Sequence, residues 1–151
     1  LFVGTAGVYP GPSAVLEIGT AAVAGELRLV STATLRGDAY HPAPLVATAE
    51  TTPALRAQLR RAADTPLATV ACPLAITQTA ALARRIAATG AALENLEAFA
   101  VARAAAAAGI PFAAVLGITN QVGPRAHAQW RANHLAASRA ACHVVWRALT
   151  R

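Results

Sequence analysis

Short apolar segments alternate with alanine-rich helical segments along most of this chain, and this alternation constrains the fold more than any other feature. The apolar segments at residues 67–72 and 112–118 have the length of buried strands, and each follows a stretch of helix-forming composition. Strands and helices that alternate with short connections are typical of a sheet covered by helices on both faces. We therefore expect an α/β domain with a mostly parallel or mixed sheet.

The other elements follow from the same periodicities and from the residues that start or stop them. Gly109 stands where a helix commonly ends in the left-handed conformation. Residues 8–12 and the polar, proline-bearing segment 36–53 are expected loops, and the longer loop is long enough to act as a lid. Strands are expected at residues 1–3, 26–35, 67–72 and 112–118, and helices at residues 54–63, 79–89, 95–108 and 124–149.

The chain opens within an expected strand. Leu1-Phe2-Val3 runs directly into Gly4-Thr5-Ala6-Gly7, without a polar lead or a signal-peptide pattern. A buried strand needs neighbouring strands on both sides, so we expect one domain over residues 1–151 that lacks strands on its amino-terminal side. The glycines predict either a tight turn at the end of the strand or a place where a flat ligand lies against the backbone.

Charge and hydropathy exclude two classes of partner. The chain has a formal net charge of +6, but it contains no lysine, its arginines are scattered, and aromatic residues make up 5% of the sequence. A nucleic-acid surface needs basic runs with interleaved aromatics, so we expect no nucleic-acid partner. The charge-free stretch 104–124 is interrupted by Gly109 and Pro111. We expect a helix end and a strand there, and no membrane association.

Cysteine and histidine spacing does not indicate a metal centre. Cys72 and Cys142 lie far apart in the sequence and have no CxxC partner, so we expect two buried thiols in a reducing cytoplasm. His127, His134 and His143 miss the i, i+4 spacing that places two ligands on one helical face. We expect neither a metal ion nor another cofactor.

Three polar side chains are candidates for chemistry. Glu94 and Glu97 lie at the start of the alanine-rich helix, where acidic residues often cap orphan amides. A ligand-binding role is the alternative, and it is stronger for Glu97, because the apolar residues after it would draw its carboxylate inward. Asn120 follows a strand at the sheet edge where α/β proteins bind ligands, with a turn-forming asparagine as the alternative. We expect Trp130 to pack rather than to hold a ligand.

Three segments, taken in order, resemble the nucleoside phosphorylase and nucleosidase superfamily, whose members cleave the N-glycosidic bond of nucleosides. They are the strand ending in Gly-Thr-Ala-Gly, then Glu-Asn-Leu-Glu-Ala-Phe-Ala-Val-Ala, then Gly-Ile-Pro-Phe-Ala-Ala-Val-Leu-Gly-Ile-Thr-Asn. The following Gln-Val-Gly-Pro-Arg, with Trp130 shortly after, is most similar to the futalosine hydrolases of menaquinone biosynthesis. The resemblance covers nearly the whole chain and is least specific over residues 36–66.

The resemblance implies roles for particular residues. Glu97 matches the glutamate that holds the ribose hydroxyls, and Asn120 matches the residue that contacts the purine base, so these two are the implied catalytic residues. A carboxylate on the sugar hydroxyls binds more strongly as positive charge develops on the sugar. Leu96 stands where a methionine usually packs on the sugar. The other implied substrate-binding residues are Thr5, Ala6, Gly7, Ile76 and Asn95.

The implied function is hydrolysis of a purine nucleoside, as in a futalosine hydrolase. A purine nucleoside phosphorylase, a methylthioadenosine or S-adenosylhomocysteine nucleosidase, and a non-catalytic truncated homologue are the alternatives. The resemblance further implies a cytoplasmic homo-oligomer with a small-molecule nucleoside as its ligand. Leu96 and Leu116 depart from the family pattern, in which a methionine and, in many members, an arginine occupy these positions. The family also has strands ahead of the Gly-Thr-Ala-Gly strand, and they supply the group that activates water.

Overall fold

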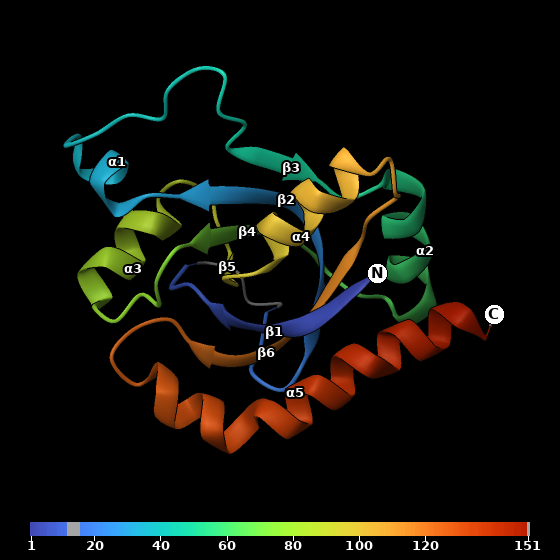
Figure 1. Ribbon diagram of the computed structural model, residues 1–151. Coiled ribbons are helices and arrows are strands. Elements are labelled where there is room, and N and C mark those ends of the chain that lie inside the picture. Colours follow the sequence, from blue (N-terminus) through green and yellow to red (C-terminus); the bar gives the residue numbers. More distant parts are fainter. Residues whose placement is uncertain (12–15, 151) are drawn as a thin grey trace.

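The computed structural model describes residues 1–11 and 16–150, in which six strands form one mixed sheet with five helices around it (Figure 1). The strand order is β3-β2-β4-β5-β1-β6. The strands are β1 (Phe2–Val8), β2 (Ala21–Val30), β3 (Thr48–Glu50), β4 (Leu67–Pro73), β5 (Leu93–Glu94) and β6 (Ala114–Gln121). The helices are α1 (Thr32–Arg36), α2 (Pro53–Ala63), α3 (Ala80–Ala87), α4 (Ala98–Ala107) and α5 (Ala126–Leu149).

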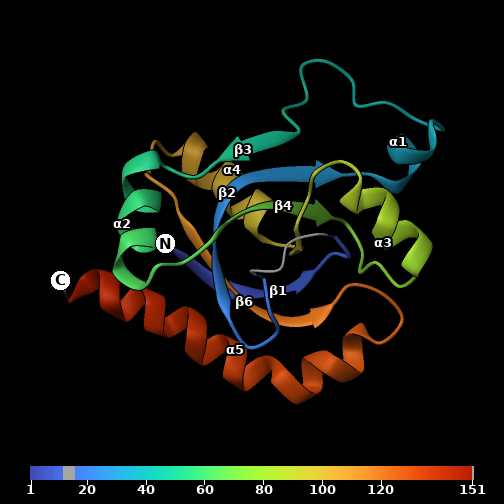
Figure 2. The same ribbon diagram turned by 180° about the vertical axis from the view of Figure 1, so that it is seen from behind.

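Strand β2 closes the sheet into a barrel-like layer. Its residues 21–23 pair antiparallel with residues 115–117 of β6, whereas its later residues pair antiparallel with β3. Along its other edge, β2 pairs parallel with β4, and one extra β2 residue shifts the register between Ala24 and Leu27. Such a bulge bends and twists a strand. The bend allows β2 to join β6 before the bulge and β3 after it (Figure 2).

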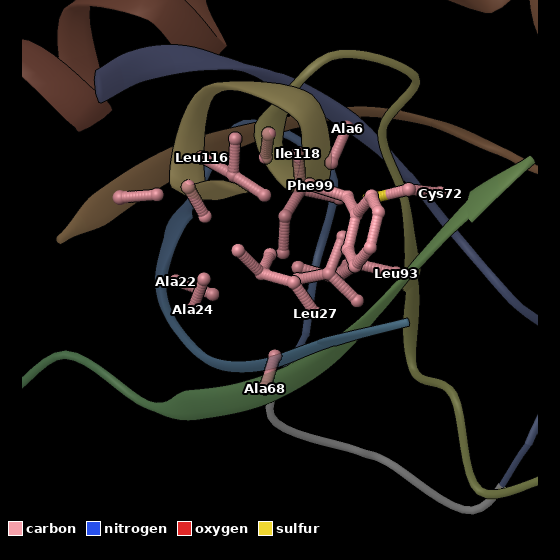
Figure 3. Close-up of a cluster of buried hydrophobic side chains, with 14 of the residues drawn as sticks. Ala6, Ala22, Ala24, Leu27, Ala68, Cys72, Leu93, Phe99, Leu116 and Ile118 are labelled. Carbon is pink, nitrogen blue, oxygen red and sulfur yellow. The ribbon is translucent and has the colours of Figure 1, made fainter. Parts of the chain in front are cut away.

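Helices cover both faces of the closed sheet, which confirms the expected class. Leu116 and Ile118 of β6 belong to an inner cluster that also contains Phe99 of α4 (Figure 3). Val115, which alternates with them, belongs to an outer cluster with residues of α2 and α5. Ile86 of α3 belongs to a third cluster, together with residues around β4. Strands buried on both faces show continuous apolar runs, which is why this sheet lacks a clear polar alternation.

Strand β1 lies inside the sheet, between β5 and β6. It pairs parallel with β6 along its whole length and antiparallel with β5 at Gly7 and Val8, so its neighbours come from later in the chain. The turn expected at the glycines is wrong, because the strand continues to Val8. Of the loop expected at residues 8–12, Val8 therefore belongs to β1, and Pro12 lies outside the described residues.

The next segments differ from expectation for a local reason. The strand expected at residues 26–35 is β2, which begins and ends five residues earlier. The Ser31 hydroxyl accepts a hydrogen bond from the Thr34 amide, and this cap starts the short helix α1. Gly37, with a φ of 84°, ends α1. The expected loop 36–53 contains β3, which pairs with β2.

The two segments with candidate polar residues also have different boundaries. Glu94 lies in β5, and the helix expected from residue 95 begins at Ala98. Strand β6 continues through Thr119 and Asn120 instead of ending at residue 118. Both the capping explanation of Glu94 and the turn explanation of Asn120 are therefore wrong. The helices expected at residues 54–63, 79–89 and 124–149 are α2, α3 and α5, with ends that differ by at most two residues.

Helix α5 crosses the sheet directly above Gly117 of β6. A Cβ atom at Gly117 would overlap the backbone carbonyl group of Ala137 in α5, so the helix can approach this closely only because residue 117 has no side chain. Ala141 and Val144 continue the same buried face of α5. Within residues 1–11 and 16–150, no helix has both the length and the apolar character needed to cross a membrane.

We expect the substitution Gly117→Ala to lower the free energy of unfolding by about 2 to 4 kcal/mol, because the new methyl group forces α5 away from β6. Denaturant unfolding of both variants measures the change. Gly11→Ala is the matched control, since no atom of residues 1–9 and 16–150 lies within 4 Å of its added Cβ, and it should change stability by less than about 1 kcal/mol. Equal stability of the two variants would contradict the close docking of α5.

Candidate active site

A cleft of about 360 Å³ opens where β1 and β6 end beside the start of α4 and the first turns of α5. The carboxyl ends of parallel strands are where α/β sheets bind ligands, and this volume is typical of small-molecule sites. The cleft is lined by Thr5, Ala6, Gly7, Ile76, Glu94, Asn95, Leu96, Glu97, Thr119, Asn120, Ala126, His127 and Trp130.

Every residue that the resemblance assigned to a substrate site lies along this cleft, although their roles stay predictions. Thr5, Ala6 and Gly7 come from β1, Ile76 from the loop after β4, and Asn120 from β6. Asn95, Leu96 and Glu97 form the connection between β5 and α4. For four other polar or aromatic lining residues, the sequence did not favour a place in the site. A ligand-binding role was the less favoured alternative for Glu94 and Trp130, and none was expected for Thr119 and His127.

Three of the lining residues form a row across the sheet. Gly7 of β1 stands opposite Glu94 of β5 and opposite Asn120 of β6. Residues that stand opposite one another on neighbouring strands point to the same face, and the strands lie about 4.8 Å apart. The carboxylate of Glu94 and the amide of Asn120 therefore flank Gly7. Because Gly7 has no side chain, the NH₂ end of the Asn120 amide and the side chain of Val122 can lie against its backbone.

Hydrogen bonds orient the amide of Asn120, which is buried. Its Oδ1 accepts from the Thr119 hydroxyl at 2.7 Å, and its Nδ2 donates to the carbonyl of Gln121 at 3.0 Å. A Cβ at Gly7 would lie 2.7 Å from this Nδ2 atom, so the NH₂ end of the amide leans over Gly7. An NH₂ group has two hydrogens, of which the protein uses one. Asn120 thus offers a hydrogen-bond donor to a ligand above Gly7.

Glu94 is a buried carboxylate held by two neutral donors. Its Oε2 accepts from the Tyr9 hydroxyl at 2.6 Å, and its Oε1 accepts from the Thr77 amide at 3.2 Å. Burial, followed by the hydrogen bond to Glu94, raises the pKa of Tyr9 far above that of an exposed tyrosine. Tyr9 therefore remains a donor to Glu94 over the whole range of pH in which proteins fold.

Glu97 lies at the rim of the cleft rather than inside it, so the expectation that its carboxylate is drawn inward is wrong. It occupies the position before α4, and among residues 1–11 and 16–150 its side chain has no hydrogen-bond or ion-pair partner. Asn95 instead starts this helix, since its Oδ1 accepts from the amides of Glu97 and Ala98. The Asn95 Nδ2 also donates to the Thr5 carbonyl at 3.0 Å, which ties α4 to β1.

Three aromatic rings stack along the first turns of α5, beside the cleft. The rings of Trp130 and His134 are 4.9 Å apart, and those of His127 and Trp130 are 6.2 Å apart, with interplanar angles below 20°. Trp130 is 41% exposed and lines the cleft, and its ring packs against these two histidine rings rather than in the core.

The cleft carries carboxylates but no strong cation. Neither arginine nor lysine occurs among the described residues that line it, and no three His, Cys, Asp or Glu side chains of that part of the chain are grouped as metal ligands. Cys72 is buried beneath the cleft, and burial raises the pKa of its thiol to about 11. Cys142 is exposed, which corrects the expectation of two buried thiols.

The fold and the cleft together define an α/β protein with a cleft of small-molecule size at the ends of two parallel strands. More specifically, the chain belongs to the phosphorylase superfamily, whose family model matches residues 1–150. The resemblance noted in the sequence is thereby confirmed at the level of the superfamily. No curated protein matches the sequence significantly.

Solved structures share the fold at low sequence identity. A futalosine hydrolase mutant of Helicobacter pylori strain 26695 matches with a TM-score of 0.83 and 18% identity, over 99% of this chain and 67% of that one. The 5'-methylthioadenosine/S-adenosylhomocysteine nucleosidase of Helicobacter pylori matches with a TM-score of 0.82 and 16% identity, over 98% of this chain and 66% of that one. The 5'-methylthioadenosine/S-adenosylhomocysteine nucleosidase of Colwellia psychrerythraea 34H, in complex with adenine, matches with a TM-score of 0.83 and 16% identity. This match covers 98% of this chain and 64% of that one. The chain thus spans about two thirds of the length of these proteins.

The raised pKa of Tyr9 predicts a loss of stability at high pH. An unfolded tyrosine loses its proton near pH 10, whereas folded Tyr9 keeps it, so the folded state binds more protons above that pH. The free energy of unfolding should therefore fall as the pH rises above 10, by up to about 1.4 kcal/mol per pH unit from this group. Urea unfolding between pH 9 and about 11 should show a shallower decline for Tyr9→Phe. Identical slopes in the two proteins would contradict the burial of a neutral Tyr9.

Proposed function

We propose that this chain forms the nucleoside-binding part of an N-glycosidase that hydrolyses a 6-oxopurine nucleoside, in the manner of a futalosine hydrolase. The proposal rests on one juxtaposition: an unpartnered carboxylate, Glu97, and an oriented amide donor, Asn120, line the same cleft. Superfamily membership supports this class of reaction.

Glu97 would act on the sugar. When the bond between base and sugar breaks, the sugar takes on oxocarbenium character, and a carboxylate that accepts from its hydroxyls binds this state more strongly than the ground state. The free, exposed carboxylate of Glu97 at the rim is available for such hydroxyls. Leu96 beside it is 38% exposed and offers an apolar contact for the sugar.

Asn120 would act on the base. The Thr119 hydroxyl and the Gln121 carbonyl orient the amide, whose second Nδ2 hydrogen suits the N7 and O6 acceptors of a 6-oxopurine. A base that leaves as an anion is stabilised by the same donor. An adenine would present its 6-amino donor to the amide, which then would have to turn against its two hydrogen bonds.

The choice of hydrolysis over phosphorolysis follows the resemblance to the futalosine hydrolases. The described lining residues include no arginine or lysine but two carboxylates, Glu94 and Glu97. Leu116, at the position where many relatives have an arginine, is fully buried in the inner core. In the phosphorylases, the resemblance implies that strands ahead of β1 supply much of the anion site, so the phosphate dependence of base release is the deciding measurement.

Release of hypoxanthine from inosine or futalosine by the natural protein, with and without added phosphate, tests this function directly. A phosphate requirement would favour a nucleoside phosphorylase, and a strong preference for methylthioadenosine would favour the adenine-releasing nucleosidases. Binding without any release would favour a non-catalytic homologue. The part in menaquinone biosynthesis, the cytoplasmic location and the homo-oligomeric state stay predictions from the sequence.

We expect Glu97→Gln to lower kcat for nucleoside hydrolysis roughly ten- to a thousandfold, which is the range for loss of one charge-stabilising contact. Stability should change little, since the side chain is exposed and the substitution is nearly isosteric. Glu50→Gln is the control, because Glu50 lies on the edge strand β3 and does not line the cleft. Unchanged turnover in Glu97→Gln would remove this residue from the mechanism.

We expect Asn120→Asp to shift preference from 6-oxo toward 6-amino nucleosides by about 1 to 3 kcal/mol, the scale of one mispaired buried polar contact. A protonated aspartic acid can donate to N7, and an ionised one accepts from a 6-amino group, whereas neither form reproduces the donation of the amide NH₂ group. The measurement is kcat/KM for inosine against adenosine in both proteins. Equal discrimination would separate Asn120 from base recognition.

A further inference from the structure

A second cavity, of about 250 Å³, lies beside the connection between β6 and α5 and shares no lining residue with the cleft. Asn120 and Gln121 are successive residues of β6, and successive residues of a strand point to opposite faces. Accordingly, Asn120 lines the cleft, whereas Gln121 lines the second cavity. The second cavity is therefore separate from the candidate active site, and the proposed function does not use it.

Every titratable side chain that lines this cavity in the described structure is cationic. Arg84 comes from α3 and Arg125 is the residue before α5, and no acidic residue of the described chain lines the cavity. Neither guanidinium takes part in the ion pairs of residues 1–11 and 16–150, and residues 12–15 contain no acidic side chain. Because two cations of like sign share one cavity, its potential is positive and favours a bound anion.

A neutral donor adds to the two guanidinium groups. The Oε1 atom of Gln129 in α5 accepts a hydrogen bond from the Gln121 backbone amide at 2.9 Å. This bond determines which end of the side-chain amide is which, because only the oxygen can accept from an N–H group. The two hydrogens on Nε2 of Gln129 have no acceptor within the described parts of the chain, and Gln129 lines the cavity. The cavity thus gathers three donor groups and no carboxylate.

The rest of the cavity wall is formed by small apolar side chains. Ala80 and Ala83 of α3 contribute to it, together with Val122 and Pro124 from the connection between β6 and α5. Small-molecule sites commonly combine an apolar wall with a few polar groups that orient the ligand, and they are usually larger than this one. The cavity therefore suits an anion that carries few carbon atoms.

We propose that this cavity binds the phosphoryl group of a small molecule, with Arg84 and Arg125 as the charged contacts and Gln129 as a third donor. A guanidinium group donates two parallel hydrogen bonds to phosphoryl oxygens, which makes arginine well suited to this anion. A phosphoryl group has three terminal oxygens, one for each donor group, whereas a carboxylate has only two. The proposal does not depend on nucleoside hydrolysis in the cleft.

Calorimetric titration of the natural protein with inorganic phosphate, glycerol 3-phosphate and acetate, at constant ionic strength, tests the proposal. At about pH 7.5 both phosphate compounds carry close to two negative charges. We expect saturable binding of at least one of them, and acetate should bind at least about tenfold more weakly. Tighter binding of glycerol 3-phosphate than of phosphate would assign the site to a phosphomonoester, and the reverse order would assign it to free phosphate.

Single substitutions then test the two arginines. We expect Arg84→Gln and Arg125→Gln each to weaken binding of the tighter phosphate compound about tenfold, because each removes a charge-assisted contact. Arg85→Gln is the matched control, since Arg85 is the next residue of α3, is also exposed and does not line the cavity. It removes the same charge from the same helix and should weaken binding less than about twofold.

Nuclear magnetic resonance locates the bound anion independently of the variants. The phosphate compound should shift the signals of the Gly123 backbone amide and of the Gln129 side-chain amide, since both residues line the cavity. The signal of the Glu97 amide, which belongs to the cleft, should not move.

Three results would overturn the proposal. They are the absence of saturable binding by about 50 mM of either phosphate compound, equal weakening by Arg85→Gln and Arg84→Gln, and signal shifts at Glu97 instead of at Gly123 and Gln129. Acetate that binds as tightly as phosphate would also overturn it. None of these results bears on hydrolysis in the cleft, because the two sites share no lining residue. Likewise, a failure to release a base from nucleosides leaves the anion site untouched.

Discussion

The antiparallel pairing between β2 and β6 is the constraint on which the rest of the structure depends. It closes the sheet, in which β5, β1 and β6 lie side by side next to the cleft. Closure requires β2 to bend, which its bulge allows, and it requires small residues where helices approach the strands. Gly117 beneath α5 is the clearest case, because any side chain there would overlap the helix backbone.

The cleft lies where β5, β1 and β6 are neighbours in this sheet. Pairing places Gly7 between Glu94 and Asn120, and the missing side chain at Gly7 lets the Asn120 amide lie against the β1 backbone. Asn95 then joins β1 to α4, which presents Glu97 at the rim. The polar groups of the site are thus held by strand register and by hydrogen bonds to the backbone rather than by ion pairs.

The sequence predicted those strands and helices whose apolar periodicity and end signals lie within the segment itself. Strand β4 and helices α2, α3 and α5 have strong apolar patterns and clear ends, and they were predicted within one or two residues. The predicted bounds of strand β2 lay five residues too late in the sequence. The reason is that residues 21–24 are small, are buried on both faces of the sheet and show no alternation of apolar and polar residues. Strands β3 and β5 are two or three residues long and exist only through tertiary pairing, so no local pattern indicates them.

In the candidate site, too, the residues in sequence motifs were predicted, whereas those brought together only by the fold were not. Motif order led to Glu97, Asn120 and their neighbours, all of which line the cleft, whereas Glu94 was interpreted as a helix cap. Its partners Tyr9 and Thr77 lie 85 and 17 residues away in the sequence, and only the fold brings them together. Likewise, the exposure of Trp130 depends on where α5 crosses the sheet, which helical periodicity alone does not determine.

The central claim is that a purine nucleoside lies in the cleft with its base at Asn120 and its ribose at Glu97. A crystal structure of the natural protein with a bound 6-oxopurine nucleoside tests it most directly. The account predicts Asn120 Nδ2 within hydrogen-bond distance of N7 or O6, and the ribose hydroxyls at Glu97. A base bound elsewhere, or bound in this cleft with its N7 edge turned away from Asn120, would contradict it.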